Sequence, residues 1–124
     1  MQNILSTTKT RSALILDPEF KAREILRRFL DILPEVQVKG CFDRPVKVVK
    51  YARDIEPDVV FIALELITGM NETEWLMELT KYTRIIVTAY CFDPLLDHLE
   101  EYTAGCLFKP IDMDELKDKM RDLC

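Results

Sequence analysis

The 124-residue sequence predicts an α/β domain with an open, doubly wound parallel sheet of five strands. Short apolar runs alternate along the chain with segments of helical periodicity, which is the pattern of repeated βα units. The run at 58–64 is almost wholly apolar, as a central strand covered by helices on both faces requires. No linker or repeat divides the chain, so we expect one domain over residues 1–124, with a flexible leader at 1–11.

The expected elements begin with a strand at 12–16. The Asp17-Pro18 pair after it predicts a helix start, with Asp as the cap and Pro in the first turn. Residues 36–41 alternate apolar and polar side chains, which suits a strand at or near the edge of the sheet. A helix that starts near Pro45 then leads to the central strand.

The second half of the chain continues the alternation. We expect a loop at 68–71 and a helix from Glu72 to about Thr80. The remaining elements are expected at 84–89 (strand), 93–102 (short helix), 106–108 (strand) and 114–123 (helix). The complete pattern is a flavodoxin-like (βα)5 fold with strand order 2-1-3-4-5, whose functional site lies at the carboxyl ends of the strands.

Composition excludes several classes of function. The net charge of −5 argues against direct binding of nucleic acid, because phosphate recognition needs a basic face. No stretch reaches the ~18 consecutive apolar residues of a membrane span, and the N-terminus lacks the apolar run of a signal peptide. The four cysteines occur singly, which is typical of reduced thiols rather than a zinc site. We therefore expect a cytoplasmic protein without a membrane partner.

Four strand ends carry the candidate functional residues. Asp17 follows the first strand, Ala63 and Glu65 lie at the end of the third, and Thr88 and Lys109 end the fourth and fifth. A carboxylate that holds a divalent cation, with a hydroxyl and an ammonium that bind phosphate oxygens, is the minimal set for handling a phosphoryl group. Each of the three polar groups also has a structural interpretation. Asp17 could be only a helix cap, Thr88 a β-branched strand residue and Lys109 a surface charge. Their convergence on one edge of the sheet favours the functional interpretation.

Residues 12–123 resemble the receiver domain of two-component response regulators. The resemblance rests on LILD, PDVVFIALE, RIIVTA and AGCLFKPIDMDEL, and most specifically on the Thr-Ala and Lys-Pro pairs. It implies transfer of a phosphoryl group from a histidine kinase to an aspartate that ends the third strand, assisted by Mg²⁺. It also implies a Lys-Pro peptide bond that is usually cis.

The resemblance implies roles for three residues and reveals three departures. Thr88 matches the hydroxyl that senses the phosphoryl group, Lys109 matches the ammonium, and Asp17 matches the first residue of an acidic pair. The departures are Pro18 in place of the second acidic residue, Ala63 in place of the phosphoaccepting aspartate, and Cys106 in place of a switch aromatic residue.

These departures predict a degenerate receiver. A methyl group cannot form an acyl phosphate, so we expect no phosphorylation at Ala63. Any Mg²⁺ site at Asp17 should be weak, and no cofactor is certain. Glu19 and Glu65 could partly replace the lost negative charge, and Lys109 should pair mainly with Asp17.

The predicted function is a non-enzymatic pseudo-receiver module in a phosphorelay, one that acts by protein contact and contributes to transcription regulation. Expected partners are a histidine kinase or another signalling protein, and an output domain or a second copy. The expected signalling face consists of Leu95, His98, Tyr102, Cys106 and Met113.

Two alternatives remain open. Ala63 could be an engineered Asp→Ala change in a phosphorylatable receiver, although Pro18 and Cys106 favour a natural origin. The chain could instead be a flavodoxin-like protein that binds a nucleotide or cofactor. Such a site would use a glycine-rich loop, whereas the three glycines here occur singly.

Overall fold

A single parallel sheet forms the centre of the molecule, in a computed structural model that describes residues 10–68 and 74–123. The strand order is β2-β1-β3-β4-β5, as the sequence predicts. The strands are β1 (Arg11–Leu16), β2 (Val36–Phe42), β3 (Val59–Ala63), β4 (Arg84–Ala89) and β5 (Gly105–Phe108). All strands are parallel, and the order in which successive strands are added reverses between β1 and β3, so the carboxyl ends of these strands border the expected functional edge.

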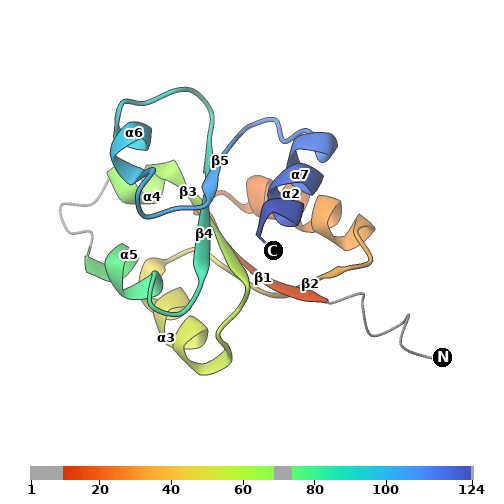
Figure 1. Ribbon diagram of the computed structural model, residues 1–124, viewed down its shortest axis with the longest axis horizontal. Helices are drawn as coiled ribbons and strands as arrows, with labels where there is room; N and C mark the ends of the chain where they lie inside the picture. The colour runs from red at the N-terminus through yellow and green to blue at the C-terminus, as the bar shows by residue number, and fades with distance from the viewer. Residues whose placement is uncertain (1–9, 69–73, 124) are drawn as a thin grey trace.

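Helices cover both faces of the sheet (Figure 1). The helices are α2 (Phe20–Ile32), α3 (Pro45–Ile55), α4 (Leu64–Thr68), α5 (Glu74–Leu79), α6 (Leu95–Leu99) and α7 (Met113–Asp122). Helices α2 and α7 lie on one face, and the other four lie on the opposite face. This two-sided cover explains why β3 is apolar throughout.

The core consists of two apolar clusters, one on each face of the sheet. Successive side chains of a strand point to opposite faces, so Val59 and Phe61 join the cluster under α2 and α7. Val60 and Ile62 join the cluster under α3 to α6. All five residues of β3 are buried, and β3 contributes to both clusters, as do β1 and β4.

The start of α2 differs from the prediction. The helix begins at Phe20, so Pro18 lies before the helix instead of in its first turn. The Asp17 carboxylate accepts a hydrogen bond from the backbone N–H of Glu19 at 2.9 Å, and no side chain caps the helix. Asp17 therefore stabilises the turn between strand and helix, and its other oxygen stays available for Lys109.

The segment after β3 also differs from the prediction. Thr68, expected in a loop, ends the short helix α4, and Leu64 is the first residue of that helix rather than the last of the strand. The rest of the expected loop, 69–71, and the expected helix start at Glu72 lie outside the described residues.

The N-terminal boundary of the expected domain and one helix need smaller adjustments. Strand β1 begins at Arg11, whose backbone N–H donates to Glu35 at 2.7 Å, so this residue does not belong to the leader. Residues 1–9 lie outside the described residues. Helix α6 ends at Leu99, three residues before Tyr102, which the sequence analysis placed in this helix.

Within the described ranges, no helix combines the length and the apolar character that crossing a membrane requires.

Candidate functional site

The candidate site lies at the carboxyl ends of β1, β3, β4 and β5. Ala63 is the last residue of β3, is completely buried, and pairs in register with Thr88 of β4. The backbone N–H of Asp17 donates to Phe42 at 3.0 Å, and that of Lys109 donates to Ala89 at 2.7 Å. Hydrogen bonds of the sheet thus hold Asp17 and Lys109 at the positions that the sequence predicts for them.

A buried ion pair joins the two charged residues of the site. The Lys109 Nζ lies 2.9 Å from the Asp17 Oδ2, and their side chains are only 9% and 5% exposed. This contact confirms the expectation that Lys109 pairs mainly with Asp17. The peptide bond between Lys109 and Pro110 is cis, as the resemblance implies.

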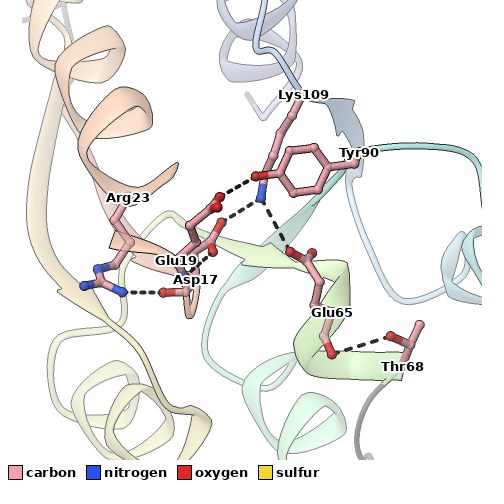
Figure 2. A network of polar contacts seen from close by, with 7 residues as sticks. All are labelled: Asp17, Glu19, Arg23, Glu65, Thr68, Tyr90 and Lys109. Atoms are coloured by element: carbon pink, nitrogen blue, oxygen red, sulfur yellow. Dashed lines mark hydrogen bonds and ion pairs between the residues drawn. The ribbon is translucent and has the colours of Figure 1, made fainter. Parts of the chain in front are cut away.

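Two further side chains surround the Lys109 ammonium (Figure 2). The Glu65 Oε2 lies 3.9 Å from Nζ, in a weaker ion pair whose carboxylate is 45% exposed. The Tyr90 ring lies on the other side, with its centroid 4.4 Å from Nζ, within the range of a cation–π contact. Glu65 reaches the site from the first turn of α4, the helix that the sequence did not predict.

The phenol of Tyr90 closes this network. Its hydroxyl donates a hydrogen bond to the carboxylate of Glu19, which joins the segment after β4 to the segment after β1. This hydrogen bond raises the pKa of Tyr90 to about 12, and the neighbouring carboxylates of Glu19, Asp17 and Glu65 add to the shift. The edge of the sheet where Lys109 lies is therefore spanned by a ring of polar contacts.

The donor set does not fit a magnesium ion. One oxygen of Asp17 accepts from Lys109 and the other accepts from the backbone of Glu19. Over residues 10–68 and 74–123, no group of three or more acidic, His or Cys side chains is placed to hold a metal ion. A cation at Asp17 would have to displace the Lys109 ammonium, so the weak Mg²⁺ site expected there gains no support from this geometry.

A cavity of about 340 Å³ opens beside the ring of contacts, between α2 and the segment after β5. Asp17, Thr88 and Lys109 line its inner end, and Ile25 of α2 lines its wall. Ala63 does not line it. The cavity is thus a space separate from the position where the third strand ends.

Solved receiver domains share this architecture. The signal receiver domain of a modulated diguanylate cyclase from Desulfovibrio desulfuricans aligns with a TM-score of 0.79 at 24% identity, over 91% of this chain and 92% of that one. The response regulator domain of Thermotoga maritima CheB aligns with a TM-score of 0.74 at 19% identity, over 93% and 97%. This chain has the fold of a response-regulator receiver domain.

Two curated relatives match the sequence with the same identity. Uncharacterized response regulatory proteins of Vibrio parahaemolyticus and Vibrio cholerae are each 30% identical over 114 residues, which is 90% of this chain. The matches cover 47% and 48% of those proteins, so the chain spans about half the length of these relatives. No protein-family model matches the sequence.

The expected signalling face lies around α6 and β5 of the receiver fold. Tyr102 is 44% exposed, and His98 is also exposed, whereas Leu95 and Cys106 are partly buried against the core. Burial raises the pKa of the Cys106 thiol. Met113 packs against the cluster on the opposite face of the sheet, so it does not share a surface with the others.

Tyr90 is the residue of the site that the sequence analysis missed. It follows the Thr-Ala pair at the end of β4, one residue beyond the segment quoted for the resemblance. Its position directly after a strand that ends at the functional edge was the available signal. The contact with Glu19, 71 residues away in sequence, gave no local signal.

Proposed function

We propose that the chain is a receiver module of two-component signalling that acts by protein contact and is not phosphorylated at position 63. The observation that carries the proposal is the side chain at the end of β3, a fully buried methyl group. An acyl phosphate needs a carboxylate there. The same module would be non-enzymatic, because the charged groups of its site are paired with one another instead of being directed at a substrate.

The charges of the site support the proposal. In a working acceptor site the ammonium would serve an incoming phosphoryl group, but here Asp17 already neutralises Lys109 at 2.9 Å. Glu65 is the nearest alternative carboxylate, yet it interacts with the same ammonium at 3.9 Å from a helix that starts beyond the strand. The Lys109 charge is therefore already balanced by carboxylates of the chain, as expected for an inactive site.

A phosphorylation assay tests this proposal. We expect the chain, incubated with acetyl phosphate and Mg²⁺, to keep its intact mass. A gain of one phosphoryl group would contradict the proposal, and a Glu65→Gln variant assayed in parallel would show whether Glu65 is the acceptor. The Ala63→Asp variant provides the matched comparison, because it restores a carboxylate at the end of β3 without changing another residue.

The surface for protein contact is proposed around β5. Three aromatic side chains are exposed near it: Phe92 at 62%, Tyr102 at 44% and Phe108 at 43%. Phe92 and Phe108, with Cys106, also line a hollow of about 290 Å³. Exposed aromatic side chains around a hollow are typical of protein interfaces, and the partner would be an output domain, another signalling protein or a second copy.

Sedimentation of the purified chain tests whether the partner at this surface is a second copy. If the partner is a second copy, the chain should sediment as a dimer and a Phe108→Ser variant as a monomer. An exposed residue on α3, Val46, offers the control, and Val46→Ser should leave the oligomeric state unchanged. A dimer that persists in Phe108→Ser would place the contact elsewhere.

A further inference from the structure

The cavity beside Lys109 has the size of a small-molecule site. Its volume of about 340 Å³ lies within the range of roughly 300–1,000 Å³ that is usual for ligand pockets. It lies between the first turns of α2 and the segment that links β5 to α7. Elements from three parts of the chain therefore enclose one space.

The wall of the cavity is mainly apolar. Ala22, Ile25 and Leu26 contribute it from two turns of α2, and Pro110 and Ile111 contribute it from the opposite side. Leu26 is buried, whereas Ile25 is 50% exposed, so the apolar wall extends from the interior to the rim. Such a wall matches a ligand with an apolar body, since binding would remove apolar surface of both partners from water.

The two buried charges at the inner end of the cavity are already paired with each other. Asp17 neutralises Lys109 at 2.9 Å, and the exposed Glu19 carboxylate accepts a hydrogen bond from the Tyr90 phenol. The other two charged residues of the lining, Glu19 and Lys21, are exposed and lie at the rim. A charged ligand group at the inner end would lack a free counter-ion there, and burying an unpaired charge is unfavourable.

One polar group at the inner end lacks a partner. Thr88 is 3% exposed and lines the cavity, and its hydroxyl makes no hydrogen bond within the described part of the chain. The hydroxyl is not one of the fully enclosed side-chain atoms without a partner in the described residues, so it is accessible from the cavity, where a ligand hydrogen bond could replace one to water. The hydroxyl can donate or accept, so it suits an uncharged polar group.

We propose that this cavity binds a small uncharged molecule with an apolar body and one hydroxyl, carbonyl or amide group, which forms a hydrogen bond with Thr88. The inference rests on the proposed function in one respect. Without an acceptor aspartate, occupancy of the cavity would supply the input that phosphorylation supplies elsewhere. The ligand would contact Thr88 on β4 and Tyr90 directly after it, in the segment that leads to α6 and the face proposed for protein contact.

The test compares four probes with the same aromatic body: benzyl alcohol, benzylamine, benzoate and toluene. Binding is followed by amide chemical shifts of the ¹⁵N-labelled chain. We expect benzyl alcohol to shift the amide signals of Ala22, Leu26, Thr88 and Ile111 with a common saturation curve. Toluene should bind more weakly, and benzylamine and benzoate more weakly still. Shifts confined to other parts of the chain, or tightest binding by either charged probe, would overturn the proposal.

Two variants examine the site independently. Ala22→Leu fills the cavity from α2 and should abolish binding, whereas Ile32→Leu changes an exposed residue of the same helix outside the cavity and should have no effect. Thr88→Val replaces the hydroxyl by a methyl group of similar size. It should lower the affinity for benzyl alcohol roughly 2- to 10-fold and leave the affinity for toluene unchanged. An equal loss for both probes would overturn the role of the hydroxyl, even if Ala22→Leu fails to fold. Failure of this inference would leave the phosphorylation result unaffected, because that result is read from the intact mass of the free chain.

Discussion

The Lys109 ammonium and the Asp17 carboxylate face each other almost out of contact with water. A pair of this kind contributes little net stability when it forms, because both ions lose their hydration. Removal of one partner is different, since it leaves the other charge buried alone. Each charge of the pair therefore depends on the other for its stability at this edge of the sheet.

Replacing Lys109 with methionine should lower the free energy of unfolding by about 3–5 kcal/mol, because Asp17 would remain as an unpaired buried charge. Urea denaturation measures this change. The matched control is Lys81→Met, which breaks an ion pair with Glu78 whose side chains are 66% and 31% exposed and should change stability far less. The double variant Asp17→Asn/Lys109→Met should be less destabilised than Lys109→Met. Equal stability of wild type and Lys109→Met would contradict the buried pair.

The phenol of Tyr90 should stay protonated in the folded chain until about pH 12, compared with 10.0 for an ordinary tyrosine. Its hydrogen bond to Glu19 needs the neutral phenol, so its contribution to stability is complete below about pH 10 and is lost as the pH rises towards about 12. Absorbance titration of wild type minus Tyr90→Phe isolates this group. Glu19→Gln should move the pKa back towards 10.0. An ordinary pKa for Tyr90 in the wild type would exclude the contact.

The start of strand β5 depends on the backbone conformation of one residue, Gly105. Gly105 opens the strand with a φ of +145°, a conformation that L-residues rarely adopt. The Lys119 side chain of α7 packs directly against it, and a Cβ at this position would lie 2.7 Å from Nζ. The glycine therefore lets the strand begin beside α7 without strain.

Gly105→Ala should destabilise the fold by about 1–3 kcal/mol, because alanine is strained at this φ. Thermal unfolding followed by circular dichroism measures the loss. Combining it with Lys119→Ala removes the side-chain contact but leaves the backbone strain, so most of the loss should persist. Complete recovery in the double variant would assign the effect to the Lys119 contact instead.

The two apolar clusters share one sheet, so they should unfold together. Leu116 of α7 belongs to one cluster, and the single tryptophan, Trp75 of α5, packs against the other. Because β3 contributes to both clusters, a loss of packing on one face should be felt on the opposite face.

Leu116→Ala should lower the free energy of unfolding by about 2–5 kcal/mol, as expected for a cavity in the core. The unfolding transition should shift by the same amount in Trp75 fluorescence and in circular dichroism, although the tryptophan lies on the opposite face of the sheet from Leu116. Ile32→Ala, at a site that is 66% exposed, should change stability by less than about 0.5 kcal/mol. Separate transitions for the two probes would show that the faces unfold independently.

The pattern of apolar runs was sufficient to predict the five strands, their order and the edge that carries Asp17, Thr88 and Lys109. Such a prediction succeeds because a strand buried on both faces must be apolar throughout, and parallel strands bring their carboxyl ends to one edge. The strand boundaries differ from prediction by at most one residue at either end. The identity of residue 63 as a methyl group needs no folding information.

Other features depend on contacts between distant segments. Tyr90 reaches Glu19 across 71 residues, and Glu65 reaches Lys109 from a helix that continues directly from β3. The cavity exists because α2 and the segment after β5 pack with a space between them. No local pattern encodes such distances, because side-chain contacts across the fold depend on how the helices pack onto the sheet. The sequence alone shows that residue 63 is an alanine, and only the folded chain shows how the polar groups at this edge of the sheet are paired.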